Sequence, residues 1–360
     1  MIYLIVLLLL PFEMAFKGNI ILTNLFAISL NANTMTVGII VALAAFFPMV
    51  FAVYAGRVSD RIGYKVPIVL GSFGVSLALI LPFIFRDMIS ILFVSQSIFG
   101  LGLIFIIVNG QKLVGEISTS DNRLNNYAIY STGISIAGLV GPIIAGFSID
   151  YFSYSTTYLF LSLMGSVPAI MIIFKVLKLP EQRLKSTKKE SNKTMDLLKL
   201  PSLRKVFIIS AIILIGSGIY ELFLPIYGNT IGLSASLIGI VSSLHASAYF
   251  IVRILMPALI KKFGEERTLT YCLFISGITF VFLPFSNNFL VLAILSFILG
   301  LGLGCGAPLS IAISYNCAPE GREGEVLGTR LMVNKIVQFF APLNFGTLGT
   351  FISIIPIFWA

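Results

Sequence analysis

Long apolar runs, separated by short polar stretches, make up most of the chain. Runs such as 37–56 and 66–85 are near 20 residues long, the length that an α-helix needs to cross a hydrocarbon core of about 30 Å. The alternating segments of about 10 residues that are typical of membrane β-barrels do not occur in the sequence. We therefore predict an all-α membrane protein, with helices at roughly 2–28, 37–56, 66–85, 88–110, 125–148, 156–176, 206–228, 236–258, 268–285, 288–314, 325–347 and a segment that starts at 350.

The composition supports this prediction and argues against several functional classes. The 360 residues are 58% hydrophobic and 11% charged, whereas soluble domains carry about a quarter charged residues. The net charge of +9 resides mainly in the loops, so nucleic acid is not an expected partner. The single His and the three Cys lack metal-site spacing, and the spans hold no nucleophile–base arrangement. We expect neither an enzyme nor a protein with a metal or another cofactor.

The Lys and Arg residues indicate on which side of the membrane each loop lies. Of the 24 basic residues, 19 fall in alternate loops and only Arg86 falls in a loop on the other side. Cytoplasmic loops carry such an excess, so we place the N-terminus and the 56–65 loop in the cytoplasm and expect a multi-pass protein of the cell membrane. The 19 residues are Arg57, Arg61, Lys65, Lys112, Arg123, the ten from Lys175 to Lys205, Lys261, Lys262, Arg267 and Arg322.

A basic linker divides the chain into two similar halves. The linker 177–205 joins an N-terminal bundle, 1–176, to a C-terminal bundle, 206–360. Landmarks recur in the two halves at offsets near 200, which we interpret as two parallel repeats of six helices. In this alignment the twelfth helix is incomplete, so the chain either is a fragment or ends naturally in an unusual place. The matching landmarks are Gly38 and Gly239, Gly63 and Gly264, Gly100 and Gly300, Pro142 and Pro342, and Gly146 and Gly346.

The loop GRVSDRIGYK, 56–65, lies between the second and third predicted helices. It resembles the signature loop of the major facilitator superfamily, and it matches that pattern at Gly56, Asp60, Arg61, Gly63 and Lys65. Tyr64 departs from it, since the family usually has a basic residue there. The resemblance covers essentially the whole chain. It implies two six-helix bundles related by a pseudo-two-fold axis, with a substrate site between them near the membrane midplane.

The resemblance also implies a conformational role for the loop. In the superfamily the loop Asp is thought to contact the start of helix eleven and a basic residue there, which here is Arg330. An acid at a helix N-terminus is favoured by the exposed N–H groups, and Gly63 permits a turn with positive φ. The alternative interpretation is that the loop is basic only because it lies in the cytoplasm.

A stretch in the fifth predicted helix, AGLVGPIIAG at 137–146, resembles a second family signature that is found in antiporters. Gly141, Pro142 and Gly146 match it. The resemblance favours export by antiport, whereas the alternative interpretation is close packing of small residues.

Ionisable residues inside spans are expensive and point to function. Glu13 and Lys17 lie four residues apart on the first helix and can pair on one face, either as a structural pair or as part of a site. Glu221 lies near Pro225, which lacks the N–H that would bond the carbonyl of residue 221. Because the resemblance places both helices at the cavity, either acid can couple transport to protons. The alternative for Glu221 is a structural ion pair with Arg253 or Lys335.

Two helices of the second half carry polar stripes that their first-half copies lack. A step of four residues keeps side chains on one face, so these stripes indicate either a cavity wall or polar contacts between helices. The excess of basic residues in the spans favours an anionic or zwitterionic substrate. The stripes consist of His245, Tyr249 and Arg253, and of Arg330, Asn334 and Gln338 with Lys335 beside them.

These features predict a secondary active transporter that moves a small solute by alternating access. The sequence has no ATP-binding motif, so an ion gradient, and first of all a proton gradient, is the expected energy source. We expect efflux of an amphiphilic compound by a monomer in the lipid bilayer, with protons as the second transported species. The alternatives are uptake of a small organic anion, and a receptor or degenerate transporter that moves nothing.

Overall fold

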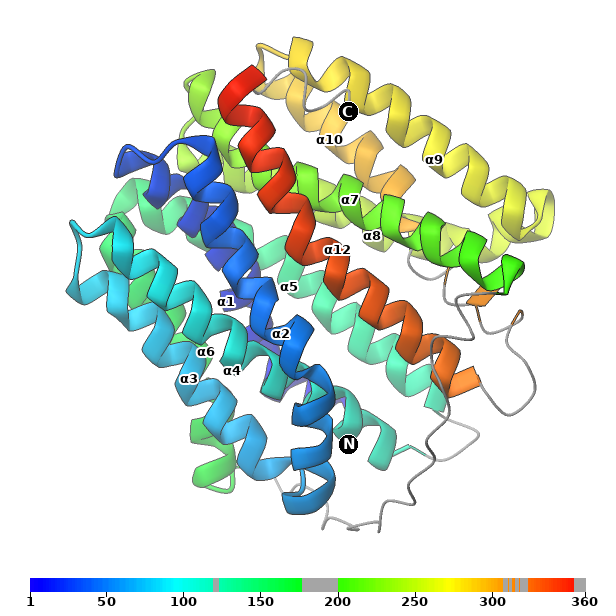
Figure 1. The fold of residues 1–360 in the computed structure, drawn as a ribbon, viewed down its shortest axis with the longest axis horizontal. Coiled ribbons are helices and arrows are strands. Elements are labelled where there is room, and N and C mark those ends of the chain that lie inside the picture. Colours follow the sequence, from blue (N-terminus) through cyan, green and yellow to red (C-terminus); the bar gives the residue numbers. More distant parts are fainter. Residues whose placement is uncertain are drawn as a thin grey trace.

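In the computed structural model the chain forms a bundle of α-helices (Figure 1). The structure describes residues 1–118, 123–176, 200–306, 310, 313–314, 317 and 323–352. The helices of the first half are α1 (Ile2–Ser29), α2 (Thr34–Ile62), α3 (Lys65–Ile84), α4 (Ile89–Glu116), α5 (Arg123–Tyr151) and α6 (Tyr154–Ile173). Those of the second half are α7 (Pro201–Thr230), α8 (Ala235–Phe263), α9 (Glu265–Phe282), a 3-10 turn (Leu283–Phe285), α10 (Phe289–Gly304) and α12 (Glu323–Ile352).

Nine of the described helices are long and apolar enough to cross a membrane. α10 is apolar but shorter, and α12 is not among the nine. Local signals set several helix starts. The Ser234 side chain accepts a hydrogen bond from the Leu237 N–H at the start of α8, and Ser153 does the same for the start of α6, as expected for residues that cap helices. The prediction of an all-α membrane protein is confirmed.

One predicted interruption between helices was wrong. The sequence placed an interruption at 348–349 and the start of a twelfth helix at 350, but α12 continues without a break to Ile352. α12 is therefore the eleventh predicted span, and residues 353–360, which the sequence assigned to the twelfth, lie outside the described part of the chain.

The two halves meet along three pairs of helices. α2 packs against α12, α5 against α8, and α1 against α7. Within the first half α3 packs against α4 and α6, and within the second half α10 packs against α8 and α9. Figure 1 shows α12 beside α2 along the seam between the halves, with α3 and α9 on opposite flanks.

The internal repeat produces the same close helix crossing twice. A Cβ on Gly239 of α8 would lie 2.5 Å from the Pro142 carbonyl oxygen of α5, so only glycine fits. Gly38 of α2 meets the Pro342 carbonyl oxygen of α12 in the same way. Small residues let helix backbones approach closely in membranes. The recurring glycines and prolines of the sequence therefore mark equivalent contacts between the halves.

The two ends of the bundle differ in their connections. We call the end that carries the short turns 30–33, 85–88, 152–153 and 231–234 the turn end, and the other end the basic end. At the basic end Gly63 follows α2 with φ of 83° and Gly264 follows α8 with φ of 81°. Both angles lie in the region that glycine adopts most readily, so the expected positive φ at Gly63 is confirmed.

Candidate functional site

Two cavities lie between the halves of the bundle. The larger, of about 380 Å³, is lined by residues of α1, α2, α4, α7, α8, α10 and α12. The smaller, of about 200 Å³, is lined by residues of α1, α5, α7 and α8. The residues that line both cavities are Lys17, Ile20, Glu221, Tyr249 and Arg253.

An ion pair between the two halves lies where the cavities meet. Lys17 Nζ of α1 lies 3.2 Å from Glu221 Oε1 of α7, and the two side chains keep 27% and 45% of their accessible surface. Lys17 therefore pairs with Glu221 and not with Glu13, which helical spacing allowed, and the alternative pairing of Glu221 with Arg253 or Lys335 is not the one found. The Lys17 side chain reaches across the interface, whereas Glu13 is buried in α1 and lines neither cavity.

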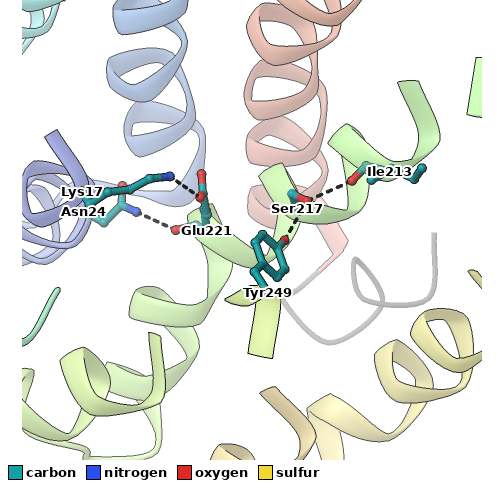
Figure 2. Close-up of polar contacts among 6 residues, drawn as sticks. All are labelled: Lys17, Asn24, Ile213, Ser217, Glu221 and Tyr249. Atoms are coloured by element: carbon teal, nitrogen blue, oxygen red, sulfur yellow. Dashed lines mark hydrogen bonds and ion pairs between the residues drawn. The ribbon is translucent and has the colours of Figure 1, made fainter. Parts of the chain in front are cut away.

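A second contact from α1 reaches the backbone of the same α7 residue. Asn24 Nδ2 donates to the Glu221 carbonyl oxygen at 3.3 Å and lies 3.4 Å from the Leu222 carbonyl oxygen. Pro225 cannot supply the N–H that an uninterrupted helix would offer to the Glu221 carbonyl, so an amide from the other half supplies a donor instead. Figure 2 shows Lys17 and Asn24 approaching Glu221 from the same side.

Aromatic side chains and a serine of the second half line the same cavities as Glu221. The Tyr249 hydroxyl lies 3.2 Å from Ser217 Oγ, which donates to the Ile213 carbonyl at 3.0 Å (Figure 2). The His245 ring lies 4.0 Å from the Tyr220 ring and 4.9 Å from the Tyr249 ring, measured between centroids.

The hydrogen bond of His245 defines which of its ring nitrogens carries a proton. Its Nδ1 lies 2.9 Å from the Ser296 carbonyl oxygen. A carbonyl only accepts, so Nδ1 donates. His245 thus lines the smaller cavity as a packed, hydrogen-bonded residue.

The other basic residues of the polar stripes contact neutral groups. Arg253 Nη1 donates to the Ser131 and Ser135 hydroxyls of α5 at 3.1 and 2.9 Å. Lys335 Nζ donates to Gln338 Oε1 at 2.9 Å.

Two more stripe residues of α12 hold neighbouring segments in place. Arg330 donates through Nε and Nη2 to Ser310 Oγ at 3.2 and 2.9 Å. Asn334 Oδ1 accepts from Ser210 Oγ of α7 at 2.9 Å. Arg330, Asn334, Lys335 and Gln338 all line the larger cavity.

The first half supplies an apolar wall to the larger cavity. Apart from Lys17, its contribution is hydrophobic and faces the polar residues of the second half across the cavity. The apolar residues are Phe16, Ile20, Val41, Ala44, Ala45, Pro48, Leu103 and Ile107.

The structure describes the 56–65 loop only in part. Gly56 and the side chains of Asp60 and Arg61 lie outside the described residues, so the contact of Asp60 with Arg330 stays a prediction. Tyr64, which replaces the basic residue of the family pattern, is fully buried. Burial and the nearby Glu116 carboxylate raise the pKa of Tyr64 to about 12. The loop therefore carries a neutral core residue there, followed by Lys65.

The helix-five signature lies where α5 crosses other helices at close range. A Cβ on Gly141 would lie 2.5 Å from the Met14 carbonyl oxygen of α1, and Gly146 meets the Ala235 carbonyl oxygen of α8. Pro142 presents its carbonyl to Gly239. Gly141 thus faces α1, whereas Pro142 and Gly146 face α8. Both faces of α5 that carry the signature pack on neighbouring helices.

Asp150 adds a polar contact between the halves at the turn end. Its Oδ1 accepts from the Ala235 N–H at 3.1 Å and its Oδ2 from the Ser236 N–H at 2.7 Å. The carboxylate of α5 thus caps the N-terminus of α8, where helices have unsatisfied N–H groups and a positive dipole end. With the glycine crossings, this contact closes the bundle at the turn end.

Sequence reasoning missed Asn24 and Asp150. Asn24 lies seven residues, or two turns, after Lys17, so the shared face of α1 was a signal for it. Asp150 is an acid at the end of a helix that carries a family signature, but its partner lies 85 residues away on another helix.

Comparisons with known proteins agree with this architecture. The model of the Major Facilitator Superfamily matches residues 4–234 and 206–360. Multidrug resistance protein 2 of Bacillus subtilis (strain 168) is 26% identical over 329 residues, which cover 89% of this chain and 81% of the relative. Quinolone resistance protein NorA of Staphylococcus aureus (strain MSSA476) is 24% identical over 323 residues, which cover 86% and 80%.

Solved structures show the same fold at low sequence identity. A bacterial homologue of the human lysosomal transporter Spinster, inward-facing and unoccupied, gives a TM-score of 0.78 at 12% identity, covering 97% of this chain and 82% of that one. The nucleoside transporter NupG gives 0.78 at 13% identity, covering 99% and 94%.

Proposed function

The chain belongs to the major facilitator superfamily, and from this premise we propose that it exports a small amphiphilic solute in exchange for protons by alternating access. A multi-pass membrane protein of this family moves small molecules across the bilayer. We propose the direction of transport, the coupling ion and the residues that are responsible for both. The names of two relatives, a multidrug resistance protein and a quinolone resistance protein, support export.

The observation that carries the proposal is the Lys17–Glu221 ion pair. It joins the two halves, and it lines both cavities. Among the described residues that line either cavity, Glu221 is the one carboxylate. An ionisable group inside a membrane at such a place is a functional residue by default. Glu13, the other acid considered, is buried away from both cavities, so we assign coupling to Glu221.

A proton on Glu221 and a cation beside it exclude each other. When Glu221 is ionised it holds Lys17, or a cationic group of the solute in its place. When it is protonated, that attraction is lost. Exchange of the solute for a proton at one carboxylate is the simplest form of antiport, because the two cannot occupy the site together.

The closed turn end fits one state of an alternating-access cycle. The turn end is closed by the Gly38 and Gly239 crossings and by the Asp150 cap. With the basic end in the cytoplasm, as the positive-inside rule indicates, this state faces inward. In the opposite state we propose that the turn end opens and that Asp60 contacts the start of α12 and Arg330. The protein acts in the cell membrane as a monomer with a cytoplasmic N-terminus.

Proton flux in inverted membrane vesicles tests the proposal. The fluorescence of a pH-sensitive dye, which the proton gradient quenches, is followed while cationic, neutral and anionic compounds are added in turn. We expect at least one compound to collapse the gradient with wild-type protein and not with Glu221→Gln. Glu13→Gln is the matched control, because it removes an acid of α1 that lines neither cavity, and it should retain the response.

Two results would overturn the proposal. If Glu13→Gln abolishes the response and Glu221→Gln keeps it, coupling resides on the other acid. If no compound collapses the gradient in the wild type, whereas compounds are taken up with protons in right-side-out vesicles, the protein imports its solute.

A further inference from the structure

The charged side chains that line the larger cavity are predominantly basic. Lys17, Arg253, Arg330 and Lys335 line it, and Glu221 is the single acid among the described lining residues. Glu221 already contacts Lys17. The cavity therefore carries an excess of positive charge next to the site of proton exchange.

Two of these basic residues donate only to neutral groups within the described part of the chain. Arg253 contacts two serine hydroxyls of α5, and Lys335 contacts the side-chain amide of Gln338 on its own helix. A basic side chain inside a membrane is costly unless an opposite charge or water compensates it. Both retain donor capacity, because a guanidinium carries five N–H groups and an ammonium three.

The lining that the first half supplies to the same cavity is hydrophobic apart from Lys17. It includes Val41, Ala44 and Pro48 of α2 and Leu103 and Ile107 of α4. A molecule that fills the cavity thus meets basic groups of α8 and α12 from the second half and apolar side chains of α2 and α4 from the first. Pockets of this kind orient a ligand by a few polar groups and bury its apolar body.

We infer that the solute is an amphiphilic zwitterion whose anionic group binds to Arg253 and Lys335 while its apolar body lies against α2 and α4. The cationic group of this solute is inferred from the proposed function, so this part of the inference rests on it. Antiport at Glu221 requires that the solute and the proton compete, and a cationic group competes directly with a proton for a carboxylate. The anionic group of the solute is inferred independently, from the excess of basic residues that line the larger cavity. Both carboxylates and acidic phosphorus or sulfur groups fit a guanidinium.

A matched series of fluorescent probes on one aromatic scaffold tests the inference. Dansylamide is neutral, dansylglycine is anionic, dansylcadaverine is cationic, and ε-dansyl-lysine is zwitterionic. Each is titrated against purified protein in lipid nanodiscs, and the change in dansyl fluorescence gives its dissociation constant. This assay needs no gradient and no transport. We expect ε-dansyl-lysine to bind tightest, by about tenfold over each singly charged probe, the factor expected from one charge-assisted contact.

Variants assign the anionic group to its residues. Arg253→Gln and Lys335→Gln should each weaken ε-dansyl-lysine about tenfold and leave dansylcadaverine unchanged. Arg253→Lys keeps the charge and should recover most of the affinity. Lys262→Gln removes an exposed basic residue of α8 that lines neither cavity, and it should change nothing.

The results separate this inference from the function on which it rests. If dansylcadaverine binds tightest and neither Arg253→Gln nor Lys335→Gln alters any probe, the inference is wrong even where proton antiport is intact. If dansylglycine equals ε-dansyl-lysine and both depend on Arg253, the solute is an anion and the zwitterion is refuted. If the expected pattern appears but Glu221→Gln leaves proton flux unchanged, the antiport proposal fails and the assignment of the anionic group stands.

Discussion

Removal of the Asp150 carboxylate should shift the protein toward the state that is open at the turn end. The carboxylate accepts hydrogen bonds from two N–H groups at the start of α8, at 3.1 and 2.7 Å. A helix cap contributes about 0.5–2 kcal/mol, and a negative charge at a helix N-terminus adds about 0.3–1 kcal/mol. Asp150 is exposed, so solvent weakens both terms, and we expect a net effect of about 1–2 kcal/mol.

This contact joins the two halves and exists only while the turn end is closed. The Asp150→Ala substitution therefore changes the equilibrium between the two states by roughly 5- to 30-fold, the factor that corresponds to 1–2 kcal/mol. Asp150→Asn keeps one acceptor oxygen and loses the charge, so its shift should be intermediate. A purely structural cap would instead lower the melting temperature without changing the populations.

Distance measurements between two spin labels resolve these populations. Met88 and Leu290 are exposed at the turn end of the first and second half, respectively, and each is replaced by Cys in a background without the three native cysteines. Double electron–electron resonance in nanodiscs should show the longer turn-end distance gaining population in Asp150→Ala. Equal distance distributions in the wild type and both Asp150 variants would refute the reasoning.

Three further substitutions test other contacts of the fold. Gly239→Ala places a Cβ 2.5 Å from the Pro142 carbonyl oxygen and should force the turn end apart in the same spin-label assay, whereas Gly218→Ala, with nothing within 4 Å, should not. Asn24→Ala removes a donor to a backbone carbonyl of α7 and should lower the free energy of unfolding by about 1 kcal/mol, measured as a reduced melting temperature in detergent. Because the pKa of Tyr64 is raised to about 12, its neutral form stabilises the fold below about pH 10 and this contribution is lost as the pH rises toward 12. The alkaline loss of stability should therefore be smaller in Tyr64→Phe, and an unchanged pH profile of the melting temperature would contradict the burial argument.

Much of the fold could be predicted because its signals are local or periodic. Apolar runs report helices directly, since each span needs about 20 apolar residues. The offset near 200 between landmarks such as Gly38 and Gly239 reports the repeat, because equivalent crossings need glycine at equivalent positions. The positive φ at Gly63 could be predicted because glycine, placed at a turn between two helices, adopts such an angle readily.

The partners within the site could not be predicted because they depend on how two distant helices face each other. Helical spacing offered Glu13 as a possible partner of Lys17, whereas its partner Glu221 lies 204 residues away. Asn24 was missed for the same reason, since its acceptor belongs to the other half. Helical periodicity indicates which residues share a face, and only the packing of the halves determines what that face meets.

The central claim is that solute and proton compete for Glu221, and proton release on binding tests it most directly. Purified protein in a weakly buffered solution with a pH indicator receives a compound that collapses the gradient in vesicles. We predict that the wild type releases protons on addition of the compound, and that Glu221→Gln binds it without release. Binding to the wild type without proton release, or an undiminished release from Glu221→Gln, would contradict the account.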